Sequence, residues 1–372
     1  MSGRVEPFRV DVEDAVLDDL RDRLANTRFA DPIPGTGWEY GTPIDEVRDL
    51  VAYWRHDYDW RAAEARLNEL DQFTTEIDGT RIHFVHARSS NPDALPLLLV
   101  HGWPGSIVEF LDVVPRLTDE FHVIAPSLPG YGFSEAPRVA GWDVARVARA
   151  FVALMERLGY ERYGAQGGDW GAQISTRIAT LDPEHCVGLH LNMPIAGPPA
   201  GDAPLTDEEQ ADLAIMARFQ REDAAYAQLQ GRHPQTLGIA LDDSPAGLLA
   251  WVAQRFRDWS DCDGVLENSF SRDQLLTNVM LYWATRSFTS SARLYWETMH
   301  SGVLHEPLEH VDVPTGIARY PKEDILRFPR SWVEHRYHVT HWADMPRGGH
   351  FAAMEEPELF ADDVRAFFRT VR

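Results

Sequence analysis

Short, continuous apolar runs alternate with helix-like segments in the middle of this 372-residue chain. The runs PLLLV (96–100) and FHVIAPS (121–127) are typical of strands that are buried on both faces of a parallel sheet. Helices are expected near 107–117 and 143–158, and a third should follow the strand-like RYGAQGG from about residue 171. This βαβ rhythm predicts an α/β fold, with a mostly parallel central sheet and helices on both faces.

This alternation of strand-like and helix-like segments stops between residues 194 and 305. This stretch is helix-like and rich in aromatic residues, as in PAGLLAWVAQRF and TNVMLYWATRSF. Strand-like patterns return with PTGIARY and RYHVTHW, and a helix closes the chain. We interpret residues 194–305 as a helical cap over the C-terminal edge of the sheet, where open α/β sheets bind ligands. The core is then expected in two parts, residues 91–193 and 306–372.

Residues 1–90 are expected to form an N-terminal extension that packs on the core and the cap. Helices are expected at 11–28, with Asp11 as the cap, and at 44–55, and each has one apolar face that needs a partner surface. The segment FTTEIDGTRIHFVH alternates around Asp78-Gly79, which is typical of a β-hairpin.

Composition limits the classes of ligand and partner. The formal net charge of −23 would repel phosphates, so we expect no nucleic-acid partner and favour a small neutral or cationic molecule. Cys186 and Cys262 form no CxxC pair, so neither a metal site nor a disulfide is expected. The start MSGRVEPFRV does not resemble a signal peptide, and no run approaches the roughly 18 apolar residues of a membrane span. We therefore expect a cytoplasmic protein that does not contact a membrane.

The segment GAQGGDWGAQ lies where a strand-like run meets a helix-like one. Asp169 is at its centre, with small residues on both sides. Aspartate often caps a helix, but a cap does not need small neighbours on both sides. A nucleophile elbow does need them, because the chain turns sharply between sheet and helix. The pattern favours Asp169 as a nucleophile, in the position where many hydrolases have serine.

The segment HGWPGS follows the strand-like PLLLV. At this place the backbone N–H of Trp103 can point at a developing oxyanion, and the residue after the nucleophile, Trp170, can supply a second donor. The alternative is a plain turn at Pro104-Gly105.

His350 lies in the glycine-rich segment RGGHFAAMEEP, ahead of the last helix. The order nucleophile, acid, histidine is that of the α/β-hydrolase fold, so an acid should follow the strand-like PTGIARY. Glu323 and Asp324 are adjacent there. We prefer Asp324, because five residues separate it from Pro329 at the start of the next helix, and we leave Glu323 open.

These residues predict an α/β-hydrolase fold with a carboxylate nucleophile. Serine attacks acyl carbons, whereas a carboxylate can displace at an sp³ carbon and form an alkyl ester of the enzyme. His350 would then activate water to hydrolyse the ester, with the N–H groups of Trp103 and Trp170 stabilising the oxyanion. Because the nucleophile regains its carboxylate, no metal or organic cofactor is required.

The same segments resemble the epoxide hydrolases of the microsomal type. The resemblance covers nearly the whole chain through FRVDVEDAVLDDLRDRLANTRF, HGWPGS, GGDWGA, LDDSPAGLLAW, LLTNVMLYW, PTG and RGGHFAAMEEPEL. It implies that the protein converts a small apolar epoxide and water to a vicinal diol. It also implies two cap tyrosines that donate hydrogen bonds to the epoxide oxygen, Tyr226 in AAYAQLQ and Tyr295 in SSARLYWET. Phenols suit this role because they are acids that stay protonated at neutral pH.

Two features depart from the family pattern. Its microsomal mammalian members begin with a membrane anchor, and we expect none in this protein. The acid loop is one residue longer here, which is why Glu323 and Asp324 compete. The sequence leaves the oligomeric state open, a homodimer included.

Two other functions are compatible with parts of the pattern. A haloalkane dehalogenase also uses an aspartate elbow, and Trp170 could bind its halide, but Tyr226 and Tyr295 favour an epoxide. A non-catalytic binding protein on the same fold would need neither Asp169 nor His350.

Overall fold

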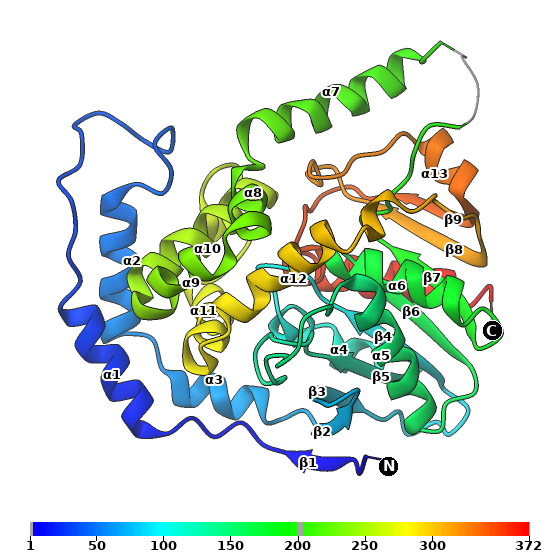
Figure 1. Cartoon of the computed structure of the whole chain (residues 1–372), viewed down its shortest axis with the longest axis horizontal. Helices are drawn as coiled ribbons and strands as arrows, with labels where there is room; N and C mark the ends of the chain where they lie inside the picture. The colour runs from blue at the N-terminus through cyan, green and yellow to red at the C-terminus, as the bar shows by residue number, and fades with distance from the viewer. Residues whose placement is uncertain (1–2, 200–203, 372) are drawn as a thin grey trace.

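The computed structural model describes residues 3–199 and 204–371. Residues 1–2 of the expected N-terminal extension, 200–203 of the expected cap and 372 at the end of the chain lie outside the described residues. Within the described residues, strands form one sheet in the order β1-β2-β3-β5-β4-β6-β7-β8-β9 (Figure 1). The strands from β5 to β9 in this order pair in parallel, and β1, β2 and β3 pair antiparallel at one edge. The strands are β1 (Glu6–Phe8), β2 (Gln72–Ile77), β3 (Thr80–Ala87), β4 (Leu95–Val100), β5 (Phe121–Pro126), β6 (Tyr163–Gly167), β7 (Cys186–Leu191), β8 (Val311–Arg319) and β9 (Tyr337–Asp344).

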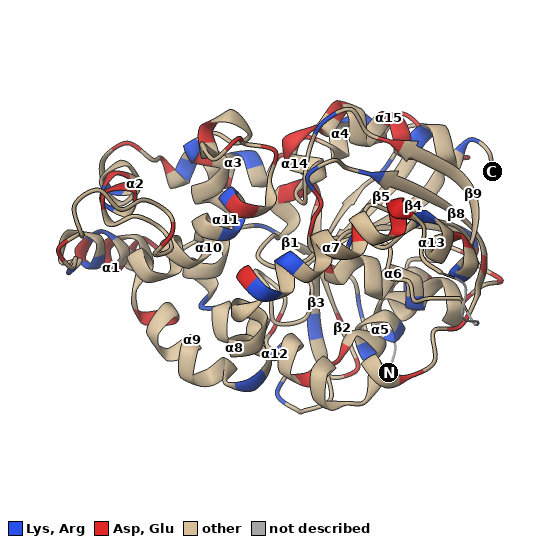
Figure 2. Cartoon of the chain, turned by 90° about the horizontal axis from the view of Figure 1, so that it is seen from above, with Lys and Arg blue, Asp and Glu red and all other residues tan. Residues whose placement is uncertain are grey.

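Helices cover both faces of this sheet, as the apolar strands require. Every residue of β4 is buried, and β4 pairs with β5 on one side and β6 on the other. Figure 2 shows α4 and α15 on one side of these strands and α5 on the other. The core helices are α4 (Val114–Leu117), α5 (Val144–Arg157), α6 (Trp170–Leu181), α13 (Arg330–Arg336), α14 (Ala352–Glu355) and α15 (Pro357–Phe368), with a 3₁₀ turn η1 (Ile107–Phe110). The α/β-hydrolase fold is confirmed.

The chain between β7 and β8 is helical and forms the cap. Its longest helix, α7, begins with a capping box in which Thr206 and Glu209 bond each other's backbone N–H groups. The cap helices are α7 (Asp207–Glu222), α8 (Ala225–Arg232), α9 (Pro234–Asp243), α10 (Pro245–Trp259), α11 (Arg272–Thr285) and α12 (Phe288–His300), with 3₁₀ turns η2 (Leu266–Asn268) and η3 (Val303–His305). Within the described residues, no helix combines the length and apolar character needed to cross a bilayer.

The N-terminal residues contact both the sheet and the cap. Strands β1, β2 and β3 extend the central sheet. Helices α1 (Asp14–Ala25) and α2 (Ile44–His56) pack on the cap helix α10, and α3 (Trp60–Leu67) packs on α11. The hairpin between β2 and β3 turns at Asp78 and Gly79, whose φ angles of 51° and 72° suit the mirror-image turns that hairpins prefer.

Two helical predictions were too long. Helix α1 begins at Asp14, so Asp11 does not cap it, because the N–H of Val12 donates to Glu64 of α3 at 2.7 Å and holds the preceding chain extended. The expected helix at 107–117 is divided into η1 and α4. Pro115 has no N–H to donate, so a continuous helix cannot form there.

Candidate active site

Asp169 stands at the sharp turn between β6 and α6. Its backbone has φ 52° and ψ −128°, a strained conformation for a residue with a side chain. The neighbouring segments are close enough to require glycine. A Cβ on Gly171 would lie 1.9 Å from the carbonyl oxygen of Val100, and one on Gly102 would lie 2.3 Å from the Asp169 side chain. The small residues of the motif therefore allow the elbow to sit against the end of β4.

The Asp169 carboxylate is buried and held by backbone donors. The N–H of Trp103 donates to its Oδ1 at 2.8 Å. Burial raises the pKa of Asp169, while the charge of His350 and the N–H groups of Trp103 and Trp170 act in the opposite direction. Both predicted oxyanion donors thus face this carboxylate.

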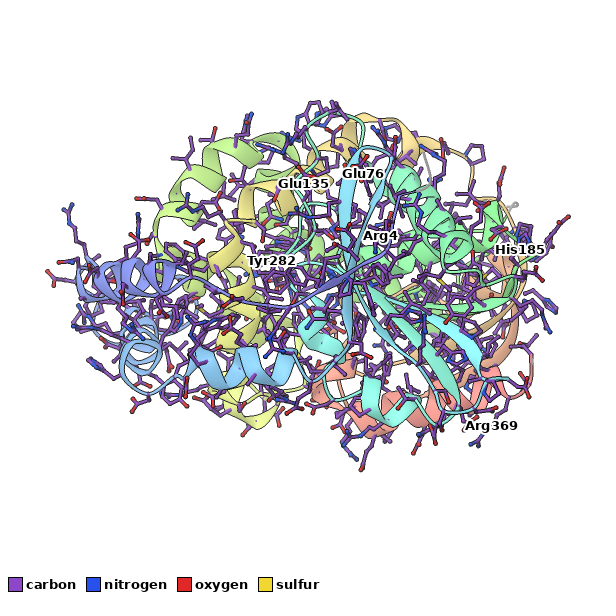
Figure 3. The ribbon with its side chains drawn as sticks, turned by 90° about the horizontal axis from the view of Figure 1, so that it is seen from below. Arg4, Glu76, Glu135, His185, Tyr282 and Arg369 are labelled. Atoms are coloured by element: carbon purple, nitrogen blue, oxygen red, sulfur yellow. The ribbon has the colours of Figure 1, made fainter. Side chains whose placement is uncertain are left out.

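The cap helix α11 fixes the loop that carries Trp103. Asn278 accepts from the Ser106 hydroxyl and donates to the Pro104 carbonyl, both at 2.7 Å. The hydroxyl of Tyr282, labelled in Figure 3, donates to the Gly105 carbonyl at 2.7 Å. The sequence predicted a helix here but not its contacts; the signal was a polar residue, Asn278, inside an apolar helix.

His350 lies between two carboxylates. Its Nε2 is 3.6 Å from Asp169 Oδ2, and its Nδ1 is 2.7 Å from Glu323 Oε2. Burial alone would lower the pKa of His350, but the charges of Glu323 and Asp169 outweigh it and raise that pKa to about 9. The backbone N–H of His350 donates to the carbonyl of Trp259 at the end of α10, so the cap also fixes this loop.

The preference for Asp324 as the acid is contradicted by this geometry. Glu323 is 5% exposed and faces His350, whereas Asp324 pairs with Arg218 of α7 at 2.8 Å. The reason is the turn of the loop, in which the N–H of Ile325 donates back to the Glu323 carboxylate. Spacing along the sequence could not reveal which of two adjacent side chains points inward.

Tyr226 and Tyr295 reach the site from α8 and α12. The Tyr226 ring stacks on Trp103 with centroids 5.2 Å apart, and the Tyr295 ring stands edge-on to Trp170 at 4.7 Å. The two tyrosine rings are 6.0 Å apart. Burial raises the pKa of both phenols above the ordinary value, so both stay protonated at neutral pH. The structure thus brings together every candidate except Asp324.

Glu109 is a residue of this site that the sequence analysis missed. It belongs to η1 and lines one small cavity with Asp169, His350 and Asn192. Its carboxylate occupies the space that a side chain at Gly105 would need. Burial raises the pKa of Glu109 to about 8. The available signal was a carboxylate inside the apolar run IVEF directly after HGWPGS.

The site contains no evident metal ligand set. In residues 3–199 and 204–371, no three histidine, cysteine or carboxylate side chains come together in a way that could hold a metal ion.

The elbow, the histidine with its acid and the inserted cap define an α/β-hydrolase with a carboxylate in the usual place of serine. The family model "Epoxide hydrolase N terminus" matches residues 5–110, and "alpha/beta hydrolase fold" matches residues 96–257. The protein belongs to the epoxide hydrolases of the microsomal type.

Relatives over nearly the full chain support this assignment. A protein of Stigmatella aurantiaca (strain DW4/3-1), provisionally named an epoxide hydrolase, is 45% identical over 382 residues, which cover 99% of this chain and 86% of that one. Epoxide hydrolase 1 of Sus scrofa is 39% identical over 404 residues, covering 98% and 88%. The crystal structure of juvenile hormone epoxide hydrolase from the silkworm Bombyx mori matches with a TM-score of 0.93 and 35% identity, covering 100% and 95%.

We predict that Glu109→Gln weakens the pH dependence of folding stability. The unfolded chain releases the Glu109 proton near pH 4.5, but the folded protein keeps it up to about pH 8, so in this window the unfolded state binds fewer protons. Raising the pH therefore favours unfolding of the parent, whereas glutamine has no proton to lose. Urea unfolding near both ends of the window should show the variant gaining stability relative to the parent as pH rises. Glu69→Gln, at an exposed position, is the control. Equal differences at both pH values would contradict the prediction.

Proposed function

We propose that this protein hydrolyses epoxides to vicinal diols through an alkyl ester on Asp169. The observation that carries the proposal is the Asp169 carboxylate itself, with Oδ1 on the N–H of Trp103 and Oδ2 facing His350. Oδ2 attacks an epoxide carbon and the carbon–oxygen bond breaks. Tyr226 and Tyr295 donate hydrogen bonds to the alkoxide as it forms, because an alkoxide is a poor leaving group without them.

The pKa of His350 fits a role that begins only after this step. At about 9 that pKa keeps the imidazole protonated in the resting enzyme. Ester formation removes the negative charge of Asp169, one of the carboxylates that raise the pKa of His350. The alkoxide takes a proton from a tyrosine hydroxyl, and the proton that His350 releases restores that hydroxyl. Neutral His350 then becomes a base held by Glu323.

Hydrolysis regenerates the starting state. Neutral His350 takes a proton from water, and the hydroxide attacks the carbonyl carbon of the Asp169 ester. The oxyanion forms at Oδ1, where the N–H groups of Trp103 and Trp170 stabilise it. The bond between the carbonyl carbon and the ester oxygen Oδ2 then breaks, and the departing diol oxygen takes the proton of the added hydroxyl group. The diol leaves, and an Asp169 carboxylate faces a protonated His350 again.

We assign the hydrolytic water to the small cavity behind Asp169. Its water-accessible volume is about 20 Å³, close to the space of one water molecule. Glu109, Asn192 and His350 line it, so a water there has polar partners and lies beside the base. With its pKa at about 8, the Glu109 carboxyl is mainly protonated at neutral pH and can donate a hydrogen bond to this water.

An apolar epoxide is the substrate class that suits this cap. The ring centroids of Tyr226, Tyr295 and Trp259 lie 5.2, 5.8 and 6.2 Å from that of Trp103. Aromatic rings around the loop of Trp103 favour an uncharged, apolar group next to the reacting carbons.

We predict that the protein converts styrene oxide to its diol and releases no chloride from 1-chlorobutane. Two phenols near the nucleophile can serve a developing alkoxide, whereas a chloride leaving group needs no proton. Both substrates are incubated with the enzyme, and diol and chloride are quantified. Chloride release without diol formation would favour the dehalogenase, and neither product would favour a non-catalytic protein.

We expect Asp169→Asn to abolish turnover while the protein stays folded, since the side chains are nearly isosteric. His350→Gln should trap the alkyl ester, because attack on the epoxide needs no base but hydrolysis does. Intact-protein mass spectrometry after epoxide treatment would show the adduct on the His350 variant. Unmodified protein with a normal diol yield would rule out these roles.

The tyrosines should affect ester formation and leave ester hydrolysis nearly unchanged. Each phenol meets charge that develops mainly in the transition state. A hydrogen bond to a charged group is worth about 1.5–3 kcal/mol, so Tyr226→Phe and Tyr295→Phe should each slow ester formation roughly ten- to a hundredfold. The double variant should be slower still. The rate is followed by pre-steady-state tryptophan fluorescence, and a double variant as fast as the parent would remove the proposed acid.

A further inference from the structure

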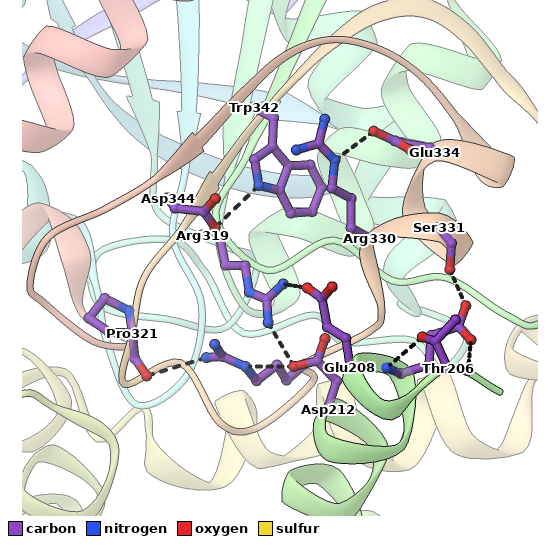
Figure 4. Close-up of polar contacts among 12 residues, drawn as sticks. Thr206, Glu208, Asp212, Arg319, Pro321, Arg330, Ser331, Glu334, Trp342 and Asp344 are labelled. Atoms are coloured by element: carbon purple, nitrogen blue, oxygen red, sulfur yellow. Dashed lines mark hydrogen bonds and ion pairs between the residues drawn. The ribbon is translucent and has the colours of Figure 1, made fainter.

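The cap helix α7 is bonded to the loop that carries Glu323. Asp212 of α7 is 3% exposed, and its Oδ1 accepts from Arg319 at 2.7 Å and from Arg327 at 3.1 Å. Figure 4 shows the ion pair between Asp212 and Arg319. A second nitrogen of the same guanidinium, Nη1, lies 3.8 Å from Oε1 of Glu208. We call Asp212, Arg319 and Arg327 the α7 cluster.

The α7 cluster surrounds the base of the acid loop, residues 320–327. Arg319 ends β8, directly before the loop, and Arg327 is the last residue of the loop. Arg327 also donates to the carbonyl groups of Tyr320 and Pro321, at 3.4 and 3.3 Å. The guanidinium of Arg327 therefore joins the two ends of the loop to each other and to α7.

The opposite side of the same loop touches the segment that carries His350. The N–H of Lys322 donates to the Gly348 carbonyl at 3.1 Å, and Lys322 forms a β-bridge with Gly349. The acid loop is thus held between α7 and the histidine segment. A shift of the α7 cluster would be transmitted to the 2.7 Å contact between Glu323 and His350.

Glu323 and the two arginines also share a cavity. Arg319, Arg327, Glu323 and Asn192 line a space of about 20 Å³ beneath the loop. Asp212 draws both guanidinium groups toward α7 through one oxygen atom. Without its negative charge, two largely buried cations would repel each other beside Glu323.

We propose that Asp212 is a positioning residue for ester hydrolysis. It acts through Arg319 and Arg327 to hold Glu323 on His350, and so couples a cap helix to the base of the second chemical step. The inference rests on the proposed function, because only an ester intermediate separates a step that needs the base from one that does not. A residue that merely stabilised the fold would not distinguish the two steps.

The test compares Asp212→Asn with the matched control Arg218→Gln. Arg218 lies on the same helix and pairs with Asp324 of the same loop, but that pair is exposed. Rapid quenching with styrene oxide, followed by intact-protein mass spectrometry and diol analysis, gives the rates of ester formation and hydrolysis. In Asp212→Asn, hydrolysis should slow about tenfold, within the range measured for residues that act through others, and ester should accumulate. Ester formation there, and both rates in Arg218→Gln, should change by less than about twofold.

Three outcomes would overturn the inference. They are an unchanged hydrolysis rate in Asp212→Asn, equal slowing of both steps, or the same slowing of hydrolysis in Arg218→Gln. If circular dichroism shows that Asp212→Asn is misfolded, Arg327→Lys gives the same test, because lysine keeps the charge but cannot bond α7 and both loop carbonyls together. A parent enzyme that forms diol without any ester contradicts the proposed mechanism itself, which separates that failure from the failure of the positioning role.

Discussion

A carboxylate buried at the end of a parallel strand is costly to desolvate, and the groups around Asp169 offset that free-energy cost. The strained backbone of Asp169 turns the chain sharply after β6, with the side chain facing the N–H of Trp103 and His350. Backbone N–H groups and protonated His350 stabilise the negative charge and so offset the cost of burying it. The same partners stabilise the carboxylate, and in the proposed mechanism they also serve its later states as nucleophile, ester and tetrahedral oxyanion.

The cap does more than cover this carboxylate. Three of its helices each bond to one loop at the C-terminal edge of the sheet. Helix α11 bonds through Asn278 to the loop after β4, α10 through Trp259 to the histidine segment, and α7 through Asp212 to Arg327 of the acid loop. Two other cap helices, α8 and α12, bring the tyrosines. Loops tolerate movement better than strands, so bonds from a second rigid layer are an effective way to fix the side chains that stand on them.

The N-terminal residues also contact the cap helices that hold these loops. Helices α1, α2 and α3 pack on α10 and α11, the two cap helices that hold the histidine segment and the loop of Trp103. Strands β1, β2 and β3, from the same residues, belong to the central sheet. One segment therefore contacts the core and the cap together, which limits how freely the cap can move relative to Asp169.

The sequence by itself determined the fold class, the elbow at Asp169, the loop of Trp103 and the position of His350, because these depend on local patterns of apolar and small residues. It could not determine which of Glu323 and Asp324 points inward. The two residues are adjacent, and the turn of the loop at Ile325 decides which side chain faces His350. Nor did it reveal Glu109, whose raised pKa comes from burial beside groups distant in sequence. The bonds from Asn278, Trp259 and Asp212 to the loops were equally hidden. Contacts between segments more than ninety residues apart are fixed only when the cap packs on the sheet, so the tertiary structure alone decided them.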